Sequence, residues 1–117
     1  MGIPDYQSII LPLLNLANNH TEVAVPNAVK ELSISFNLSE SEKAALLPSG
    51  HRTIFSDRVH WASMYLKHAG LLQRTKRGYY KITPLGRTVL KEKPTRIDKR
   101  YLSRFPSFLK FARLKNW

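Results

Sequence analysis

Apolar residues recur every three or four positions along the first third of the chain, which is the spacing of an amphipathic helix. We expect a first helix over residues 4–18, with Pro4 at its first position and a bend at Pro12. Its inward face should consist of Ile9, Ile10, Leu13, Leu14 and Ala17. The same spacing over residues 25–37 predicts a second helix.

A helix-start pattern opens the next segment. Ser39 is followed three residues later by Glu42, and this capping box predicts a short helix over residues 39–46. The sequence Pro-Ser-Gly at residues 48–50 should end it. Helical spacing resumes over residues 51–69 and predicts a fourth helix, whose inward face should consist of Phe55, Val59, Ala62, Leu66 and Ala69.

The pattern changes from helix to strand at Gly70, which suits a helix C-cap. Residues 71–82 should form a β-hairpin with its tip at residues 74–78. Side chains alternate along a strand, so one of Tyr79 and Tyr80 should point into the core and the other outward.

One more helix should follow the hairpin. Thr83 suits its N-cap and Pro84 its first position, and the core should be closed by Leu85, Val89 and Leu90. Helices followed by a strand–turn–strand unit indicate a mainly α fold with a small β-hairpin, a winged helix-turn-helix. We expect this domain to occupy residues 1–94.

Residues 95–117 should form a basic, aromatic, helical extension. They contain too many large apolar residues for a disordered linker, and Pro106 should break them into one or two short helices. The extension either packs back on the domain or forms a contact surface for another domain or subunit. Its large apolar residues include Ile97, Tyr101, Leu102, Phe105, Phe108, Leu109, Phe111 and Leu114.

Charge is distributed unevenly along the chain. The net charge is +11, yet residues 1–47 hold two Lys or Arg and five Asp or Glu, a net charge of −3. Residues 48–117 hold seventeen Lys or Arg and three Asp or Glu, a net charge of +14. This asymmetry indicates a half that faces a polyanion, and nucleic acid is the common one. An acidic membrane surface is disfavoured, because the cations gather at a hairpin tip rather than along one amphipathic helix.

Four residues on the amino-terminal half of the predicted fourth helix are candidates for contact with DNA bases or phosphates: Arg52, Thr53, Ser56 and Arg58. Arg58 lies six residues after Arg52 and therefore on another face of the helix. We expect one of the two arginines, Arg58 in particular, to pair with Asp57 or another acid of the fold. Short hydroxyl residues on a helix surface are as often merely solvated.

The hairpin tip carries the strongest candidates. Arg74, Lys76 and Arg77 repel one another and add nothing to a core, whereas together they match closely spaced phosphates. Lys81 is a weaker member of the group. A solvated turn is the alternative.

Two aromatic residues are candidates for a pocket that holds a modified base. An exposed Trp61 could stack on an extruded base, although a Trp at helical spacing more often packs against the core, which is the interpretation we favour. Tyr79 would be the second pocket residue.

Catalytic chemistry finds little support. The chain has no Cys, which excludes a disulfide, a thiolate zinc site and a thiol nucleophile. The four His residues lack metal-ligand spacing, and no Gly-rich phosphate loop is present. We expect no metal, no cofactor and no enzyme activity from this chain alone. The apolar run at residues 9–14 is too short to span a membrane, so we expect a soluble, cytoplasmic protein.

Several segments together carry a family resemblance. The chain resembles the amino-terminal domain of Mrr-type restriction endonucleases, which are modification-dependent, type IV enzymes. The resemblance spans Ile3 to about Phe111 and rests on residues 3–7, 46–55, 57–62, 65–72, 77–79, 82–83 and 96–106.

This resemblance implies a winged-helix module that binds duplex DNA, methylated or not. In the family such a module precedes a nuclease domain of the PD-(D/E)xK type and serves restriction of methylated foreign DNA. This chain stops at Trp117, so the nuclease domain is expected in a longer form or in a partner chain. The alternative is a protein-interaction or homodimerisation module of a restriction or DNA-processing complex, which the aromatic extension favours.

Overall fold

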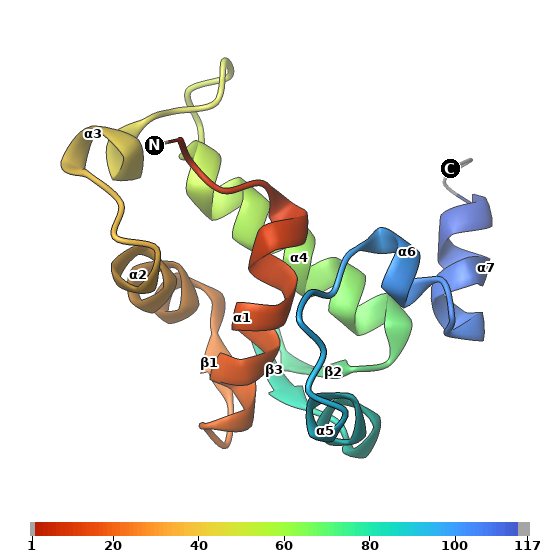
Figure 1. The fold of residues 1–117 in the computed structure, drawn as a ribbon. Coiled ribbons are helices and arrows are strands. Elements are labelled where there is room, and N and C mark those ends of the chain that lie inside the picture. The colour runs from red at the N-terminus through yellow and green to blue at the C-terminus, as the bar shows by residue number, and fades with distance from the viewer. Residues whose placement is uncertain (1, 115–117) are drawn as a thin grey trace.

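Two long helices pack across each other at the centre of the fold. The computed structural model describes residues 2–114, with α1 at Tyr6–Asn18 and α4 at Ile54–Ala69. In Figure 1, α1 lies in front of α4. The predicted inward faces of both helices are confirmed, because all ten apolar residues expected there are at most 3% exposed. Burying a large apolar side chain of this kind stabilises the fold by about 1.5 to 3 kcal/mol.

The start of α1 differs from the prediction. The helix begins at Tyr6 rather than at Pro4, because the Asp5 carboxylate accepts a hydrogen bond from the Ser8 backbone N–H at 2.9 Å and caps the helix. Pro12 lies inside the helix, which continues through it.

Two shorter helices, α2 (Val25–Ser35) and α3 (Glu40–Ala44), lie to one side of α4 (Figure 1). The capping box predicted for α3 is confirmed. The Glu42 N–H donates to the Ser39 hydroxyl at 3.1 Å, and the Ser39 N–H donates to the Glu42 carboxylate at 2.8 Å. This second hydrogen bond lowers the pKa of Glu42.

Residues 45–54 form a hairpin that the sequence did not predict, here called the 45–54 hairpin. Leu46 and Thr53 pair as an isolated antiparallel bridge, and the Leu47 N–H donates to the Arg52 carbonyl at 2.9 Å. The fourth helix therefore begins at Ile54 and not at His51, because the preceding residues bond back across the hairpin. Figure 1 shows this hairpin projecting from the fold beside the amino-terminal end of α4.

A three-stranded antiparallel sheet follows α4. Strands β2 (Leu72–Lys76) and β3 (Tyr79–Ile82) form the predicted hairpin, the wing, and the short β1 (Val23–Ala24) pairs with β3. β1 was missed, because two residues are too few to show an alternating pattern. It completes the element order of a winged helix-turn-helix, which confirms the predicted fold class. The expected alternation is also confirmed, since Tyr80 is buried and Tyr79 is half-buried.

Helix α5 (Pro84–Lys91) packs close against the chain that leads into the sheet. The predicted N-cap is confirmed, since the Thr83 hydroxyl accepts from the Gly86 N–H at 3.0 Å. The prediction that Leu85 closes the core was wrong, because this side chain is 42% exposed. Gly86 faces inward instead, and a Cβ there would overlap the Leu71 carbonyl oxygen.

The extension packs back on the domain through α6 (Lys99–Leu102) and α7 (Pro106–Leu114). Because α7 begins at Pro106, the predicted break there is confirmed. Ile97, Leu102 and Phe108 are fully buried, and the rings of Phe111 and His68 stack with their centroids 3.7 Å apart. The division of the chain at residue 94 stays a prediction, and residues 115–117 lie outside the described residues. Within residues 2–114, no helix combines the length and the apolar character needed to cross a membrane.

The tight contact at α5 gives a test of this packing. Gly86→Ala should lower the free energy of unfolding by about 1 to 3 kcal/mol or more, because the new methyl group meets backbone that has no room to move. Urea denaturation measures the effect. Gly2→Ala is the matched control, since an added Cβ meets nothing within 4 Å there. Equal stability of the two variants would contradict the position of α5.

Candidate nucleic-acid interface

The core contacts of α4 determine which of its side chains remain outside. Six side chains of α4 point away from the buried face at a turn of 100° per residue: Asp57, His60, Trp61, Met64, Lys67 and His68. Trp61 and Lys67 are exposed, and the other four are partly exposed. The sequence prediction missed Lys67 and Met64 as contact candidates, although the helical spacing of the core residues was enough to find them.

Arg52 and Asp57 form an ion pair at the start of α4. The Arg52 Nη1 lies 3.2 Å from the Asp57 Oδ1. Arg52 was predicted to lie on the fourth helix. It lies instead at the end of the 45–54 hairpin, one residue before the N-cap of α4. The ion pair expected for Arg58 is therefore made by Arg52.

Arg58 holds the beginning of the chain instead. Its Nη1 donates to the backbone carbonyls of Ile3 and Pro4, at 2.9 and 3.1 Å. The side chain is half-buried, so its charge is committed to residues more than fifty positions away. These contacts favour a structural role for Arg58 over contact with a ligand.

Thr53 and Ser56 serve the helix start. The Thr53 hydroxyl accepts from the Ser56 N–H at 3.1 Å, which makes Thr53 the N-cap of α4. Both residues are half-buried. Their expected contacts with phosphates or base edges stay a prediction.

His60 lies one turn after Asp57 on the same side of α4. Partial burial lowers the pKa of His60, and the nearby positive charge of Arg52 lowers it further, while Asp57 acts in the opposite direction. The uncharged form of the imidazole is therefore favoured more than in a free histidine. From the sequence, His60 was considered only as a metal ligand.

The four cations of the wing differ in their surroundings. Arg74, Arg77 and Lys81 are exposed. The Lys76 Nζ lies 3.9 Å from a carboxylate oxygen of Glu22 and 4.3 Å from the centroid of the Tyr79 ring. Thr75 donates a hydrogen bond to the same carboxylate. Glu22 therefore partly neutralises Lys76, which the sequence had grouped with its two neighbours.

The tip of the wing is fixed to α2. The Gly78 carbonyl accepts a hydrogen bond from the Val25 N–H at 3.0 Å, and Gly78 has a φ of +81°, which favours glycine. This contact joins the wing to the first residue of the helix that packs against α4.

Trp61 and Tyr79, the two residues of the expected modified-base pocket, lie on different elements. Trp61 is exposed, and its ring meets the rings of Tyr65 and His60 edge-on, whereas Tyr79 lies beneath Lys76. Both rings have neighbours within the fold, which agrees with the packing role favoured for Trp61. A pocket shared by the two stays a prediction.

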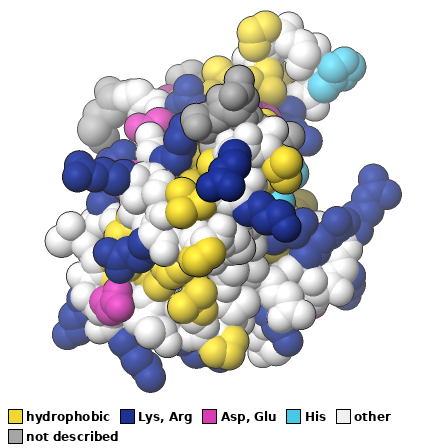
Figure 2. All heavy atoms as spheres, turned by 90° about the vertical axis from the view of Figure 1, so that its right-hand side faces the viewer, with side chains coloured by type: hydrophobic (Ala, Val, Ile, Leu, Met, Phe, Trp, Pro, Cys, Tyr) yellow, Lys and Arg dark blue, Asp and Glu magenta, His cyan; other side chains and the backbone are white. Residues whose placement is uncertain are grey.

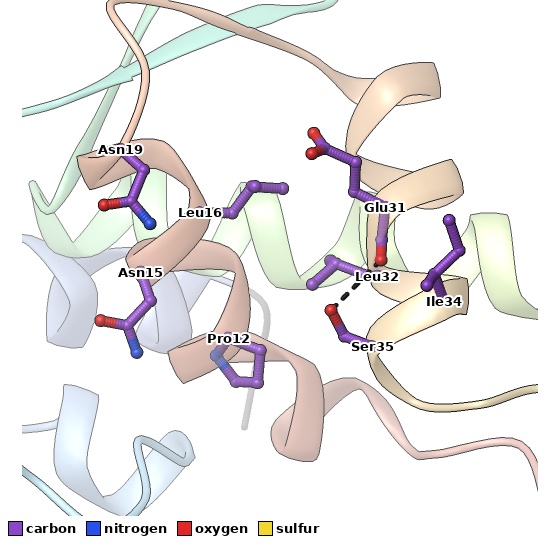
Figure 3. Close-up of a pocket in the computed structure, with 8 residues that line it drawn as sticks. All are labelled: Pro12, Asn15, Leu16, Asn19, Glu31, Leu32, Ile34 and Ser35. Carbon is purple, nitrogen blue, oxygen red and sulfur yellow. Dashed lines mark hydrogen bonds between the residues drawn. The ribbon is translucent and has the colours of Figure 1, made fainter.

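A hollow of about 480 Å³ lies elsewhere, between α1 and α2 (Figure 3). Asn15 and Asn19 line its α1 side, and Glu31 and Ile34 line its α2 side. The hollow contains no predicted contact residue and belongs to the acidic half of the chain. Within residues 2–114, no group of three His, Asp or Glu side chains is placed to hold a metal ion.

Comparison with known proteins finds one family and one relative that match this chain. The family model described as the Mrr N-terminal domain matches residues 6–92, which span α1 to α5 and the wing. The type IV methyl-directed restriction enzyme EcoKMrr of Escherichia coli strain K12 is 33% identical over 87 residues. The alignment covers 74% of this chain but only 28% of that enzyme, so the chain matches little more than a quarter of its relative. A search of solved structures finds no match.

The anchoring role of Arg58 can be tested by stability. Arg58→Met keeps most of the aliphatic side chain but removes both hydrogen bonds, and it should lower the free energy of unfolding by about 1 to 3 kcal/mol. Arg87→Met is the control, because Arg87 is exposed on α5. Thermal unfolding of the two variants compares them, and an equal decrease in both would argue against the anchor.

His60 gives a pH dependence with a definite sign. Its pKa is lower in the folded protein than in the unfolded chain, where a histidine titrates near 6.5. The unfolded chain therefore binds the proton more readily, and stability falls as the pH drops below about 6.5. His60→Gln should lose less stability than the parent between pH 7.5 and pH 5, as measured by urea denaturation at both values. An unchanged loss in this variant would contradict the burial of His60.

Proposed function

This chain belongs to the Mrr N-terminal domain family, and from that premise we propose that it binds duplex DNA as the target-recognition module of a restriction system. The relative that matches it is described as a methyl-directed restriction enzyme, so we propose methylated DNA as the target. DNA cleavage is assigned to a nuclease domain in the same chain or in a partner chain.

One observation carries this proposal: a winged-helix fold whose wing carries four cations, Arg74, Lys76, Arg77 and Lys81. The region from residue 48 onward has a net charge of +14, and it includes α4 and the wing. A winged helix places its recognition helix in the major groove and its wing along the neighbouring phosphates. Charge and fold therefore favour the same partner.

The wing would supply affinity rather than sequence preference. Arg74 and Arg77 are exposed and can approach phosphate oxygens without breaking an ion pair that holds the fold together. Lys76 would contribute less, because Glu22 competes for it. Contacts of this kind release condensed counterions, so the resulting affinity depends steeply on salt.

The outer side of α4 would read the bases. The exocyclic N6 of adenine and C5 of a pyrimidine both lie in the major groove, so a methyl group on either faces a helix in that groove. Met64 offers an apolar, flexible side chain on this side of α4, next to His60 in the direction of the helix axis. This arrangement suits contact with a methyl group.

A second candidate function is supported by one specific observation. Three leucines on α5 and α7 are exposed: Leu85, Leu109 and Leu114, the last by 79%. Figure 2, which views this side of the molecule, shows hydrophobic side chains in the middle of the face, with Lys and Arg side chains among and around them. A large exposed apolar area often marks a protein contact, such as a second copy of the chain or a nuclease domain. A dimer that forms without DNA would favour this candidate.

Replacement of the wing cations tests the DNA-binding proposal. The triple variant Arg74→Ala, Lys76→Ala, Arg77→Ala should bind every duplex more weakly, because phosphate contacts are independent of sequence. The slope of log K against log salt should fall by about 0.9 for each phosphate that the variant no longer neutralises. Fluorescence anisotropy at two or more salt concentrations measures both, on duplexes that are unmodified, N6-methylated at adenine and C5-methylated at cytosine.

A charge-matched control separates the wing from net charge. The variant Arg87→Ala, Lys91→Ala, Lys110→Ala removes three exposed cations from α5 and α7, and it should bind DNA nearly as the parent does. An equal decrease in affinity in both triple variants would assign the effect to net charge. A parent that binds no duplex would rule out the DNA-binding role and favour the protein-interaction candidate. A preference of the parent for one methylated duplex that survives higher salt would support a modification reader.

A further inference from the structure

An acidic residue occupies the surface through which α4 would approach DNA. Asp57 is partly exposed on the outer side of α4, where a carboxylate alone would repel phosphates. It accepts a hydrogen bond from Arg52 at 3.2 Å. The two charges largely cancel, which makes Arg52 a poor phosphate clamp compared with Arg74 or Arg77 of the wing.

The structure fixes the position from which Arg52 extends. Its carbonyl accepts from the Leu47 N–H across the 45–54 hairpin, and the next residue, Thr53, caps α4. The backbone of Arg52 is therefore held on both sides, at the amino-terminal end of α4. In helix-turn-helix proteins, residues at this end of the recognition helix contact base edges.

The Arg52 guanidinium keeps N–H donors available for a ligand. An arginine side chain has five N–H donors, and the structure records one nitrogen, Nη1, in contact with Asp57. The Arg52 side chain is 45% exposed and the Asp57 side chain 25%, so the carboxylate is the more enclosed support and the guanidinium the more accessible tip. A guanidinium that is oriented from one side can donate two parallel hydrogen bonds from another, which matches O6 and N7 of guanine.

We propose that Asp57 is a positioning residue that presents the Arg52 guanidinium to a guanine in the major groove, and that this pair sets the sequence preference of the chain. The inference rests on the proposed DNA-binding function and names guanine as the base that is recognised. The wing then supplies affinity for any duplex, while Arg52 selects among duplexes. His60 lies one turn after Asp57 on the same side of α4, and partial burial lowers its pKa, which disfavours a charged imidazole beside the carboxylate.

A purely structural role for Asp57 predicts a different result. An acid in the first turn of a helix stabilises its amino-terminal end through the helix dipole, whatever the ligand. If that were its whole role, Asp57→Asn would reduce stability and leave the choice of base unchanged. The positioning role requires the reverse: a loss of base preference with binding to non-preferred DNA retained.

The experiment begins with selection of a preferred sequence from a randomised duplex by the parent chain. The parent should select a guanine at one position and lose about 5- to 150-fold in affinity when that guanine is replaced by 7-deazaguanine, which lacks the N7 acceptor. Asp57→Asn should lose most of this sensitivity, yet bind a non-preferred duplex as tightly as the parent or more tightly, because a negative charge has been removed.

Two further variants make the result decisive. Arg52→Lys keeps the positive charge but not the planar fork, and it should also lose sensitivity to 7-deazaguanine. Glu40→Gln removes an exposed acid on α3 and should keep the sensitivity of the parent. Circular dichroism confirms that each variant is folded, and Arg52→Lys still tests the contact between Arg52 and guanine if Asp57→Asn does not fold.

The outcomes separate this inference from the proposed function. Retention of the 7-deazaguanine effect in Asp57→Asn overturns the positioning role of Asp57, and retention in Arg52→Lys overturns the assignment of Arg52 to the guanine. A parent that binds duplexes without a guanine preference overturns both and leaves the DNA-binding role standing. A parent that binds no duplex removes the proposed function and this inference together.

Discussion

Burial of the apolar face of α4 against α1 is the constraint on which the rest of the structure depends. Once Phe55, Val59 and Leu66 are enclosed, the rotation of the helix about its axis is fixed, and so is the set of side chains that point outward. Gly70, in a left-handed conformation with φ of +84°, then ends the helix and directs the chain into β2. The position of the wing thus follows from the packing of one helix.

The sequence was sufficient wherever structure follows from local spacing and local capping. The inward faces of α1 and α4, the capping box at Ser39 and the N-cap at Thr83 all depend on residues within a few positions of one another. Prediction failed where partners are distant in the chain. β1 exists only because it pairs with β3, more than fifty residues away, and the exposed Leu85 reflects the close approach of α5 to the Leu71 backbone.

The same limit applies to the candidate interface. Sequence could locate the cations but not their partners, so it expected Arg58 rather than Arg52 to pair with Asp57 and gave the three wing cations equal weight. The structure distinguishes them. Arg58 is held by the backbone at residues 3 and 4, Lys76 by Glu22, and Arg52 by Asp57, while Arg74 and Arg77 are exposed on the wing. The charge pattern therefore supports a prediction of the class of ligand, whereas the partners of individual cations are known only from tertiary contacts.

The stacking of Phe111 on His68 has a mechanical consequence. The rings of Phe111 and His68 are nearly parallel, and Phe108 packs beside Tyr65, one helical turn earlier on α4. Helix α7 therefore contacts the carboxyl-terminal half of α4 through two successive turns. The extension is thereby held against the same helix whose amino-terminal end carries the ion pair of Arg52 and Asp57, so its position and the orientation of that helix depend on one another.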